Sequence, residues 1–192
     1  TLLLTKSNIL LAKILEKDNK FQTALNVLGQ IEKRISGFSV RSEYRSHLPE
    51  IIFLQGDLYQ KLGNKSEAYD RYRLLHIAFP TNQITRQAKE EMNKLAKDMT
   101  INIQPLALKE YEQRTRALLR EVEYQQVVSE VSELLTINTS LPANFYFYLA
   151  RAQKGLRKRN QANSALKKFL AHHPNHKRKQ EALFMIGRNL WN

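Results

Sequence analysis

Apolar residues recur three and four positions apart along almost the whole chain, which is the spacing of one face of an α-helix. In residues 8–17, for example, this spacing puts Leu11, Ile14 and Leu15 on one side. The pattern predicts helices over residues 8–17, 21–35, 50–62, 65–79, 84–97, 105–121, 124–137, 143–156, 160–172 and 178–190. No segment alternates convincingly as a strand would, so we expect an all-α fold.

Two helix–turn–helix stretches share one order of large and small residues, which indicates an internal repeat. The first ends at Pro80 and contains, in order, Ile52, Gly56, Tyr59, Gly63, Ala68, Tyr72 and Leu75. The second ends at Pro174 and contains Tyr146, Leu149, Ala150, Ala162, Leu166 and Phe169. Each stretch departs from the order once, at Gln55 and at Gln153 respectively. Small residues let two helices touch, and the large residues fill the space between successive pairs.

This order resembles the tetratricopeptide superfamily, whose units span about 34 residues. The resemblance implies an α-solenoid, which is a superhelix of stacked helix pairs. We expect residues 1–192 to form one such domain, with units near 5–36, 49–80, 108–139 and 143–174 and a half unit at 180–192. A loop at 36–48 and an extra helix at about 84–97 make the repeat spacing irregular.

Within that superfamily the chain resembles most the N-terminal superhelical domain of soluble lytic murein transglycosylases. The segments EYEQRTRALLREVEYQQVVSEVSELL and ALFMIGRNLWN carry this likeness. It implies a periplasmic protein that cleaves peptidoglycan through a lysozyme-like module with a catalytic glutamate. That module has no counterpart in these residues, so the chain would be the non-catalytic scaffold of such an enzyme.

Both ends of the sequence look cut, which suggests a piece of a longer protein. The half unit at 180–192 has no second helix of its own. We therefore expect a solvent-exposed apolar stripe at Leu183, Ile186 and Leu190.

The net charge is +13, and it is unevenly spread. Residues 1–142 carry 20 basic and 17 acidic side chains, whereas residues 143–192 carry 11 basic side chains and one acidic residue, Glu181. Such a basic region attracts polyanions by long-range electrostatics. Nucleic acid, an anionic lipid surface and the carboxylate-rich bacterial cell wall are the candidates.

Four residues in one helix form the candidate binding groove: Asn144, Phe147, Arg151 and Lys154. At helical spacing they share one side, which in the tetratricopeptide superfamily usually lines the concave groove. A groove of this kind would suit an extended anionic ligand. Lys167 and Lys168 lie on the outer side of the following helix, where we interpret them as solvated surface charges.

The aromatic run FYFY at 145–148, followed by basic residues, also has the composition of a single-strand nucleic-acid surface. Four consecutive aromatic residues cannot all line one groove at helical spacing, so we interpret most of them as packing. Nucleic-acid binding then rests on net charge alone and ranks last.

No residue pattern predicts a catalytic or cofactor site. The chain has no cysteine, and His172, His173 and His176 beside Pro174 lack the further converging ligands of a zinc site. A glycine-rich phosphate loop is also missing, and no segment approaches the roughly 20 apolar residues of a membrane span. Two functions remain: a transglycosylase scaffold on peptidoglycan, and a protein-interaction adaptor that binds acidic peptide segments.

Overall fold

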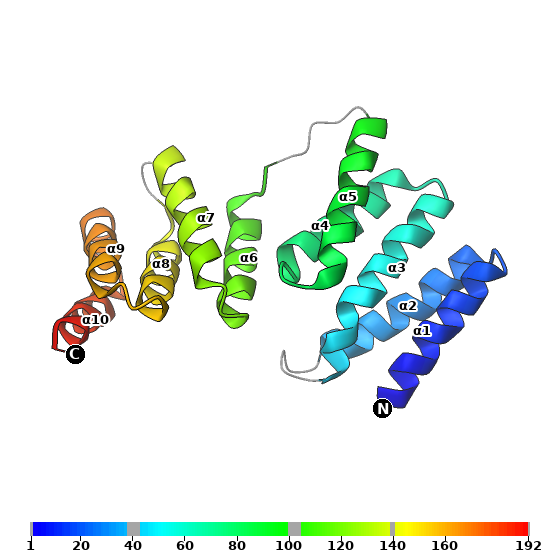
Figure 1. Ribbon diagram of the computed structural model, residues 1–192, viewed down its shortest axis with the longest axis horizontal. Coiled ribbons are helices and arrows are strands. Elements are labelled where there is room, and N and C mark those ends of the chain that lie inside the picture. The colour runs from blue at the N-terminus through cyan, green and yellow to red at the C-terminus, as the bar shows by residue number, and fades with distance from the viewer. Residues whose placement is uncertain (1, 38–42, 100–104, 139–140, 192) are drawn as a thin grey trace. The chain divides into compact units, whose positions relative to one another are not determined.

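The computed structural model describes residues 2–37, 43–99, 105–138 and 141–191 (Figure 1). Over these residues the fold is all-α and has no strand, so the predicted fold class is confirmed. The α-helices are α1 (Leu2–Lys17), α2 (Phe21–Ser36), α3 (Leu48–Lys61), α4 (Lys65–Ala78), α5 (Gln83–Asp98), α6 (Leu108–Arg120), α7 (Tyr124–Ile137), α8 (Ala143–Gly155), α9 (Arg159–His172) and α10 (Lys179–Trp191). A short 3-10 helix, η1 (Glu43–His47), precedes α3. None of the helices in the described ranges is long and apolar enough to cross a membrane.

The helices group into two compact units, Thr1–Leu106 and Ala107–Asn192. Unit 1 contains α1 to α5, and unit 2 contains α6 to α10. Each unit buries its own cluster of apolar side chains. The expectation of one continuous domain over residues 1–192 stays a prediction.

Within each unit, every α-helix packs against the next one in the sequence. In addition, α3 contacts α5 and α6 contacts α8. This pattern of nearest and next-nearest neighbours is that of a helical solenoid, in which no pair can cover its apolar surface alone. The helix α5 lies where the sequence pattern predicted an extra helix, and it packs on α3 and α4.

One type of turn closes four helix pairs. Three residues separate the helices in α1/α2, α3/α4, α6/α7 and α8/α9, and the central one has a positive φ: Asn19, Gly63, Val122 and Arg157. In each turn the third residue donates its backbone N–H to the carbonyl five positions earlier, as in Lys158 to Gln153 at 2.8 Å. This bond satisfies a carbonyl that the helix end would otherwise leave free. The repeat is thus visible in the backbone as well as in the side chains.

The inward face of α1 differs from the expectation. Thr5, Ile9 and Ala12 are its buried residues, whereas Leu11 and Ile14 are 43% and 49% exposed. Among the described elements, α1 packs against α2 and η1 and forms two ion pairs with α3, and these contacts leave Leu11 and Ile14 largely exposed. Periodicity identified the helix, but it could not say which apolar stripe a neighbour covers.

Candidate functional site

The predicted groove residues lie on the surface formed by α6, α8 and α10, which we call the A face of unit 2. These are the first helices of successive pairs. The turns at Val122 and Arg157 match, so Arg116 in α6 is equivalent to Arg151 in α8. In α10 the buried residues Ala182 and Asn189 match the buried Phe145 and Ala152 of α8, and this register makes Arg188 the third equivalent arginine.

Asn144 joins the elements of the A face. Its amide Nδ2 donates to Glu112 Oε1 of α6 at 3.1 Å, and its Oδ1 accepts from Arg178 just before α10 at 3.1 Å. Both ends of the amide are therefore occupied. Asn144 orders the surface and offers little to a ligand.

Glu112 is surrounded by donors. It accepts from Arg116 at 2.9 Å and from the Tyr148 hydroxyl at 2.9 Å, in addition to Asn144. Arg116 Nε donates to the Tyr148 oxygen at 2.7 Å, and this bond raises the pKa of Arg116. Burial is the main cause that raises the pKa of Tyr148, so this phenol keeps its proton and bridges the two charges at neutral pH.

Phe147 is buried, with 4% of its surface exposed. The Arg178 guanidinium carbon lies 3.5 Å from the centre of the Phe147 ring, and the Phe169 ring lies 4.9 Å away, edge-on. Arg178 also makes two hydrogen bonds to Glu181, at 2.7 and 2.8 Å, and these lower the pKa of that carboxyl. The Arg178 guanidinium therefore covers the face of the Phe147 ring on which we expected a ligand to stack. A ligand could stack there only after Arg178 had moved.

Unlike Asn144 and Phe147, the other two predicted groove residues, Arg151 and Lys154, are not engaged by neighbouring side chains. Arg151 is exposed and Lys154 is half-buried, and neither makes a hydrogen bond or ion pair with any described residue. The two carboxylates of this face, Glu112 and Glu181, already have cationic partners. The A face therefore presents uncompensated positive charge on α8.

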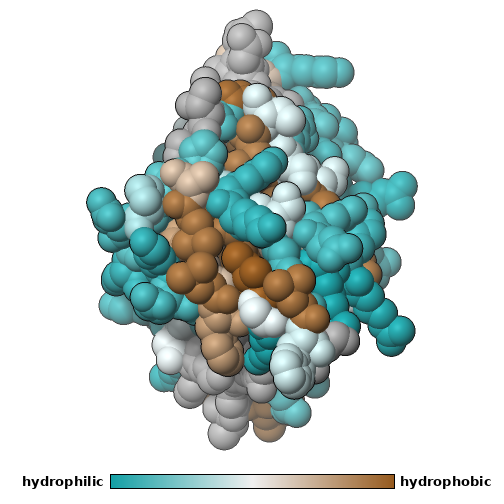
Figure 2. Space-filling model, turned by 90° about the vertical axis from the view of Figure 1, so that its left-hand side faces the viewer, coloured by the Kyte–Doolittle hydropathy of each residue, from teal (hydrophilic) through white to brown (hydrophobic). Residues whose placement is uncertain are grey.

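Exposed and partly exposed apolar residues extend along α10. Of the predicted stripe, Leu183 and Leu190 are 45% and 72% exposed, whereas Ile186 is half-buried against the core. Phe184 and Trp191 add to it, with 68% and 92% exposure. Figure 2 shows hydrophobic side chains as a continuous band on the C-terminal side of the molecule. In the register above, Phe184 and Trp191 correspond to Phe147 and Lys154, so the A face continues onto α10.

The histidines form an aromatic cluster. His173 lies 5.6 Å from Phe169 and stacks on it, and His172 stacks on Tyr146 at 5.9 Å between ring centres. A ring nitrogen of His173 is 2.8 Å from the Leu141 carbonyl oxygen. In the part of the chain that the structure describes, no group of three histidine, aspartate or glutamate side chains could hold a metal ion. These rings pack the end of the α8/α9 pair.

Comparison with known families gives one match. Residues 145–176 match the family described as tetratricopeptide repeat. The α8/α9 pair is similar to a tetratricopeptide repeat. No curated protein sequence matches the chain.

Solved structures with related arrangements are distant in sequence. A Podospora anserina protein of nearly identical tetratricopeptide-like repeats has 16% identity and a TM-score of 0.41, covering 97% of this chain and 85% of that one. The TPR2AB domain of yeast Sti1, in a complex with pHSP90, has 18% identity and a TM-score of 0.39, covering 97% and 70%. A thermophilic tetratricopeptide protein of Thermus thermophilus has 14% identity and a TM-score of 0.39, covering 98% and 100%. The narrower likeness to lytic transglycosylases stays a prediction.

Sequence reasoning placed Arg151 and Lys154 on an open surface but missed most of their surroundings. The pairing of Glu112, Arg116 and Tyr148 joins residues more than thirty positions apart, which no local pattern reveals. The row of equivalent arginines at 116, 151 and 188 could have been found, because a repeat register predicts it.

Proposed function

We propose that unit 2 is a protein-interaction scaffold whose A face binds an extended acidic segment of a partner protein. The observation that carries this proposal is the uncompensated charge of Arg151 and Lys154 on α8, and Arg151 lies at the repeat position that Arg116 of α6 and Arg188 of α10 also occupy. An extended chain with regularly spaced carboxylates could contact one helix after another. Guanidinium groups suit this role, because they bind carboxylates through two parallel hydrogen bonds.

The local charges favour an acidic ligand over a basic one. Arg151 and Lys154 have no anionic partner among the described residues, and Glu112 and Glu181 are neutralised by Arg116 and Arg178. A basic ligand would have to displace those arginines. An acidic ligand can bind the free cations and leave the existing pairs intact.

Trp191 provides a direct probe of this binding. It is the only tryptophan of the chain and is 92% exposed on α10. A labelled glutamate-rich peptide should shift its fluorescence, while the same peptide with glutamine at every glutamate should not. Fluorescence anisotropy of the labelled peptide then gives the dissociation constant.

Reversal of the two free cations tests the site. Arg151→Glu combined with Lys154→Glu should weaken binding by more than about tenfold, because two attractive contacts become repulsive. The matched control, Lys158→Glu with Lys167→Glu, changes two exposed lysines of the α9 segment and lowers the net charge equally. Equal losses in both double variants would mean that net charge, and not the A face, attracts the peptide.

The resemblance to murein transglycosylases carries a second proposal. The chain would then be the scaffold of a periplasmic enzyme, and the A face would bind the acidic stem peptides of peptidoglycan. Co-sedimentation with purified insoluble peptidoglycan, with soluble DNA as competitor, tests it. Pelleting that persists with DNA and is lost in the Arg151→Glu/Lys154→Glu variant supports this function, and pelleting that DNA abolishes contradicts it.

A further inference from the structure

The outward side of α10 is an apolar face within a basic region. Four large apolar side chains of this helix are exposed, and we call them the α10 face: Leu183, Phe184, Leu190 and Trp191. Residues three and four apart share one side of a helix, and this spacing places all four around Gly187. A methyl group added at Gly187 would meet no atom within 4 Å, so the centre of the face is open. Figure 2 shows hydrophobic side chains gathered on this side of the molecule.

The opposite side of α10 is fixed against α9. Ala182 and Asn189, which are seven residues apart, are buried on that side. The amide Nδ2 of Asn189 donates to Oδ1 of Asn163 in α9 at 2.8 Å. This buried hydrogen bond sets the rotation of α10, because turning the helix would leave both amides without that partner. The α10 face therefore points outward while α10 packs on α9.

Cations flank the α10 face on both edges. Lys179 lies one turn before Leu183, Arg188 lies one turn after Phe184, and both cations are exposed. Lys177, just before the helix, is exposed as well. An exposed apolar stripe with leucine, phenylalanine and tryptophan between basic residues is typical of a helix that lies in the surface of an anionic membrane.

The local charge distinguishes the possible occupants of this face. Glu181 is the only acidic side chain of residues 143–192, and two hydrogen bonds to Arg178 neutralise it. A second copy of the chain would bring the same cations against the face, so like charges oppose a symmetric dimer. An anionic membrane complements both parts of the surface, because it presents negative headgroups above apolar acyl chains.

We propose that the α10 face binds the surface of an anionic lipid bilayer. Its apolar side chains enter the boundary between headgroups and acyl chains, while Lys179 and Arg188 contact the headgroups. Trp191 lies at the same boundary, where tryptophan is enriched in membrane proteins. The proposal does not rest on peptide binding at Arg151 and Lys154, so either can fail without the other.

Trp191, the only tryptophan of the chain, reports the contact directly. The whole chain is titrated with vesicles of phosphatidylcholine and phosphatidylserine in equal parts, and with vesicles of phosphatidylcholine alone. The expected result is a saturable blue shift of the tryptophan emission with the anionic vesicles, and binding to the neutral vesicles that is weaker by more than about tenfold. Phospholipids brominated in the acyl chains should quench the emission, because their bromine atoms lie inside the bilayer.

The apolar contribution is tested with Phe184→Ser combined with Leu190→Ser. These residues are 68% and 72% exposed, so the chain should stay folded, and binding to the anionic vesicles should weaken by more than about tenfold. The control is Val122→Ser combined with Ile137→Ser, which removes two apolar side chains of similar exposure, 61% and 73%, outside α10. The control should bind as the parent chain does.

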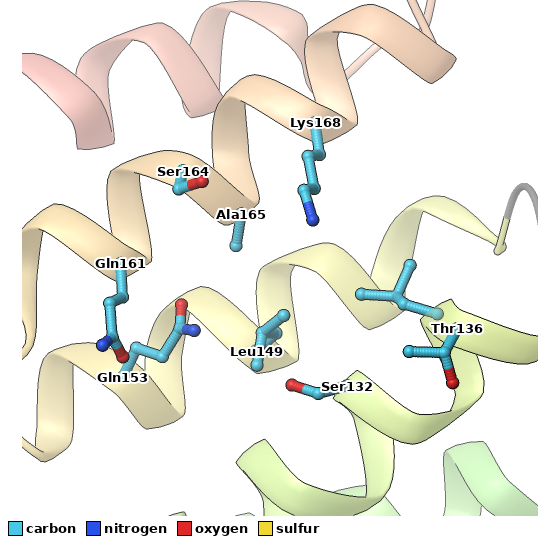
Figure 3. A pocket seen from close by; sticks show the side chains of 9 residues that line it. Ser132, Thr136, Leu149, Gln153, Gln161, Ser164, Ala165 and Lys168 are labelled. Carbon is cyan, nitrogen blue, oxygen red and sulfur yellow. The ribbon is translucent and has the colours of Figure 1, made fainter.

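The cationic contribution is tested with Lys179→Gln, which should weaken vesicle binding by about fivefold. The control is Lys168→Gln, because it lowers the net charge equally at another exposed lysine. Lys168 extends from α9 into the space over α8, where it lines a separate pocket of about 310 Å³ between α7 and α9 (Figure 3). No lining residue of this pocket belongs to α10, so the control should bind nearly as the parent does.

Three results would overturn the proposal. The first is the absence of a blue shift with anionic vesicles, and if the glutamate-rich peptide then shifts the same emission, the face belongs to a protein partner. The second is an equal loss in Lys179→Gln and Lys168→Gln, or no loss in the Phe184→Ser/Leu190→Ser variant, which would assign the binding to net charge. The third is a blue shift that grows with protein concentration without lipid, which would assign the face to a second copy of the chain.

Discussion

The α3/α4 pair of unit 1 and the α8/α9 pair of unit 2 solve one packing problem with different residues. In α3/α4, Gly56 lies directly under the Tyr72 ring, so that a Cβ on Gly56 would come within 2.5 Å of it. In α8/α9 the equivalent residues are Ala150 and Leu166, a larger residue under a smaller one. The summed volume of the two side chains at the crossing is thus roughly the same in both pairs, but each pair divides it differently between its two helices.

The difference extends to the polar groups. The Tyr72 hydroxyl donates to Asp57 at 2.6 Å and accepts from Gln60 at 2.9 Å, so its oxygen is fully used. In α8/α9 the polar residue is Gln153, whose Oε1 is left without a partner beside a pocket. The Oε1 of Gln55 in α3 is also left without a partner in the described residues. The two pairs therefore share an unpaired buried amide oxygen and differ in the Tyr72 hydrogen bonds, which Leu166 at the equivalent position cannot make.

The largest effect should come from placing alanine at the crossing of unit 1. Gly56→Ala forces the buried Tyr72 ring to move, and we expect a loss of about 2–3 kcal/mol in the free energy of unfolding. Adding Tyr72→Leu recreates the α8/α9 arrangement and should restore part of that loss. Urea denaturation of the single and double variants measures both. A single variant as stable as the parent would mean that the crossing is looser than the Gly56–Tyr72 geometry shows.

The second-largest effect should come from neutralising the acidic partner of an ion pair, and it should differ between the two units. Arg114 and Glu130 in unit 2 share three hydrogen bonds of 2.9–3.2 Å, and the Arg114 side chain is 8% exposed. The Arg71–Glu32 pair of unit 1 is more open, at 29% and 21% exposure. Glu130→Gln should lower stability by about 2 kcal/mol, because it leaves a buried charge poorly paired. Glu32→Gln is the comparison, and an equal or greater loss there would contradict the role given to burial.

A smaller effect is expected at the turns, where the two units can be compared at one backbone position. Gly63 and Val122 both have positive φ, at 78° and 65°, and Val122 is 61% exposed. A β-branched residue is strained in this conformation, whereas glycine is not. Val122→Gly should therefore stabilise the chain by about 1 kcal/mol, and the reverse change Gly63→Val should destabilise it. Thermal unfolding followed by circular dichroism checks both signs.

The smallest effect is a pH dependence at Asp57. Burial is the main cause that raises the pKa of this carboxyl above 3.8, so the folded state holds its proton more tightly than the unfolded state. Stability from this group is therefore lost as the pH rises from 3.8 through the raised value. Asp57→Asn keeps an acceptor for Tyr72 and removes that loss. Its urea midpoint relative to the parent should be more favourable at neutral pH than below pH 3.8, and a constant difference would exclude the mechanism.

Predictability from the sequence varies with the range of the interaction. The helices, the fold class and the surface positions of exposed Arg151 and half-buried Lys154 follow from apolar spacing and repeat register, which are local. The burial of Phe147 does not, because it depends on Arg178, which lies beyond α9 in the sequence. Likewise Leu11 and Ile14 have the right spacing for a core, but the described neighbours of α1 leave them exposed.

By itself the sequence determined that the chain forms helix pairs, because a period of three to four residues and small residues at the crossings allow little else. Its excess of lysine and arginine after residue 142 also determined that this part of the chain is strongly basic. Only the tertiary structure decided which of those cations are free and which are paired. It also decided that Gln153 and Lys168 face one pocket, because a pocket exists only where α7, α8 and α9 leave space between them. Packing between segments that are distant in the sequence decides both the pairing of the cations and the existence of the pocket, and no single helix contains that information.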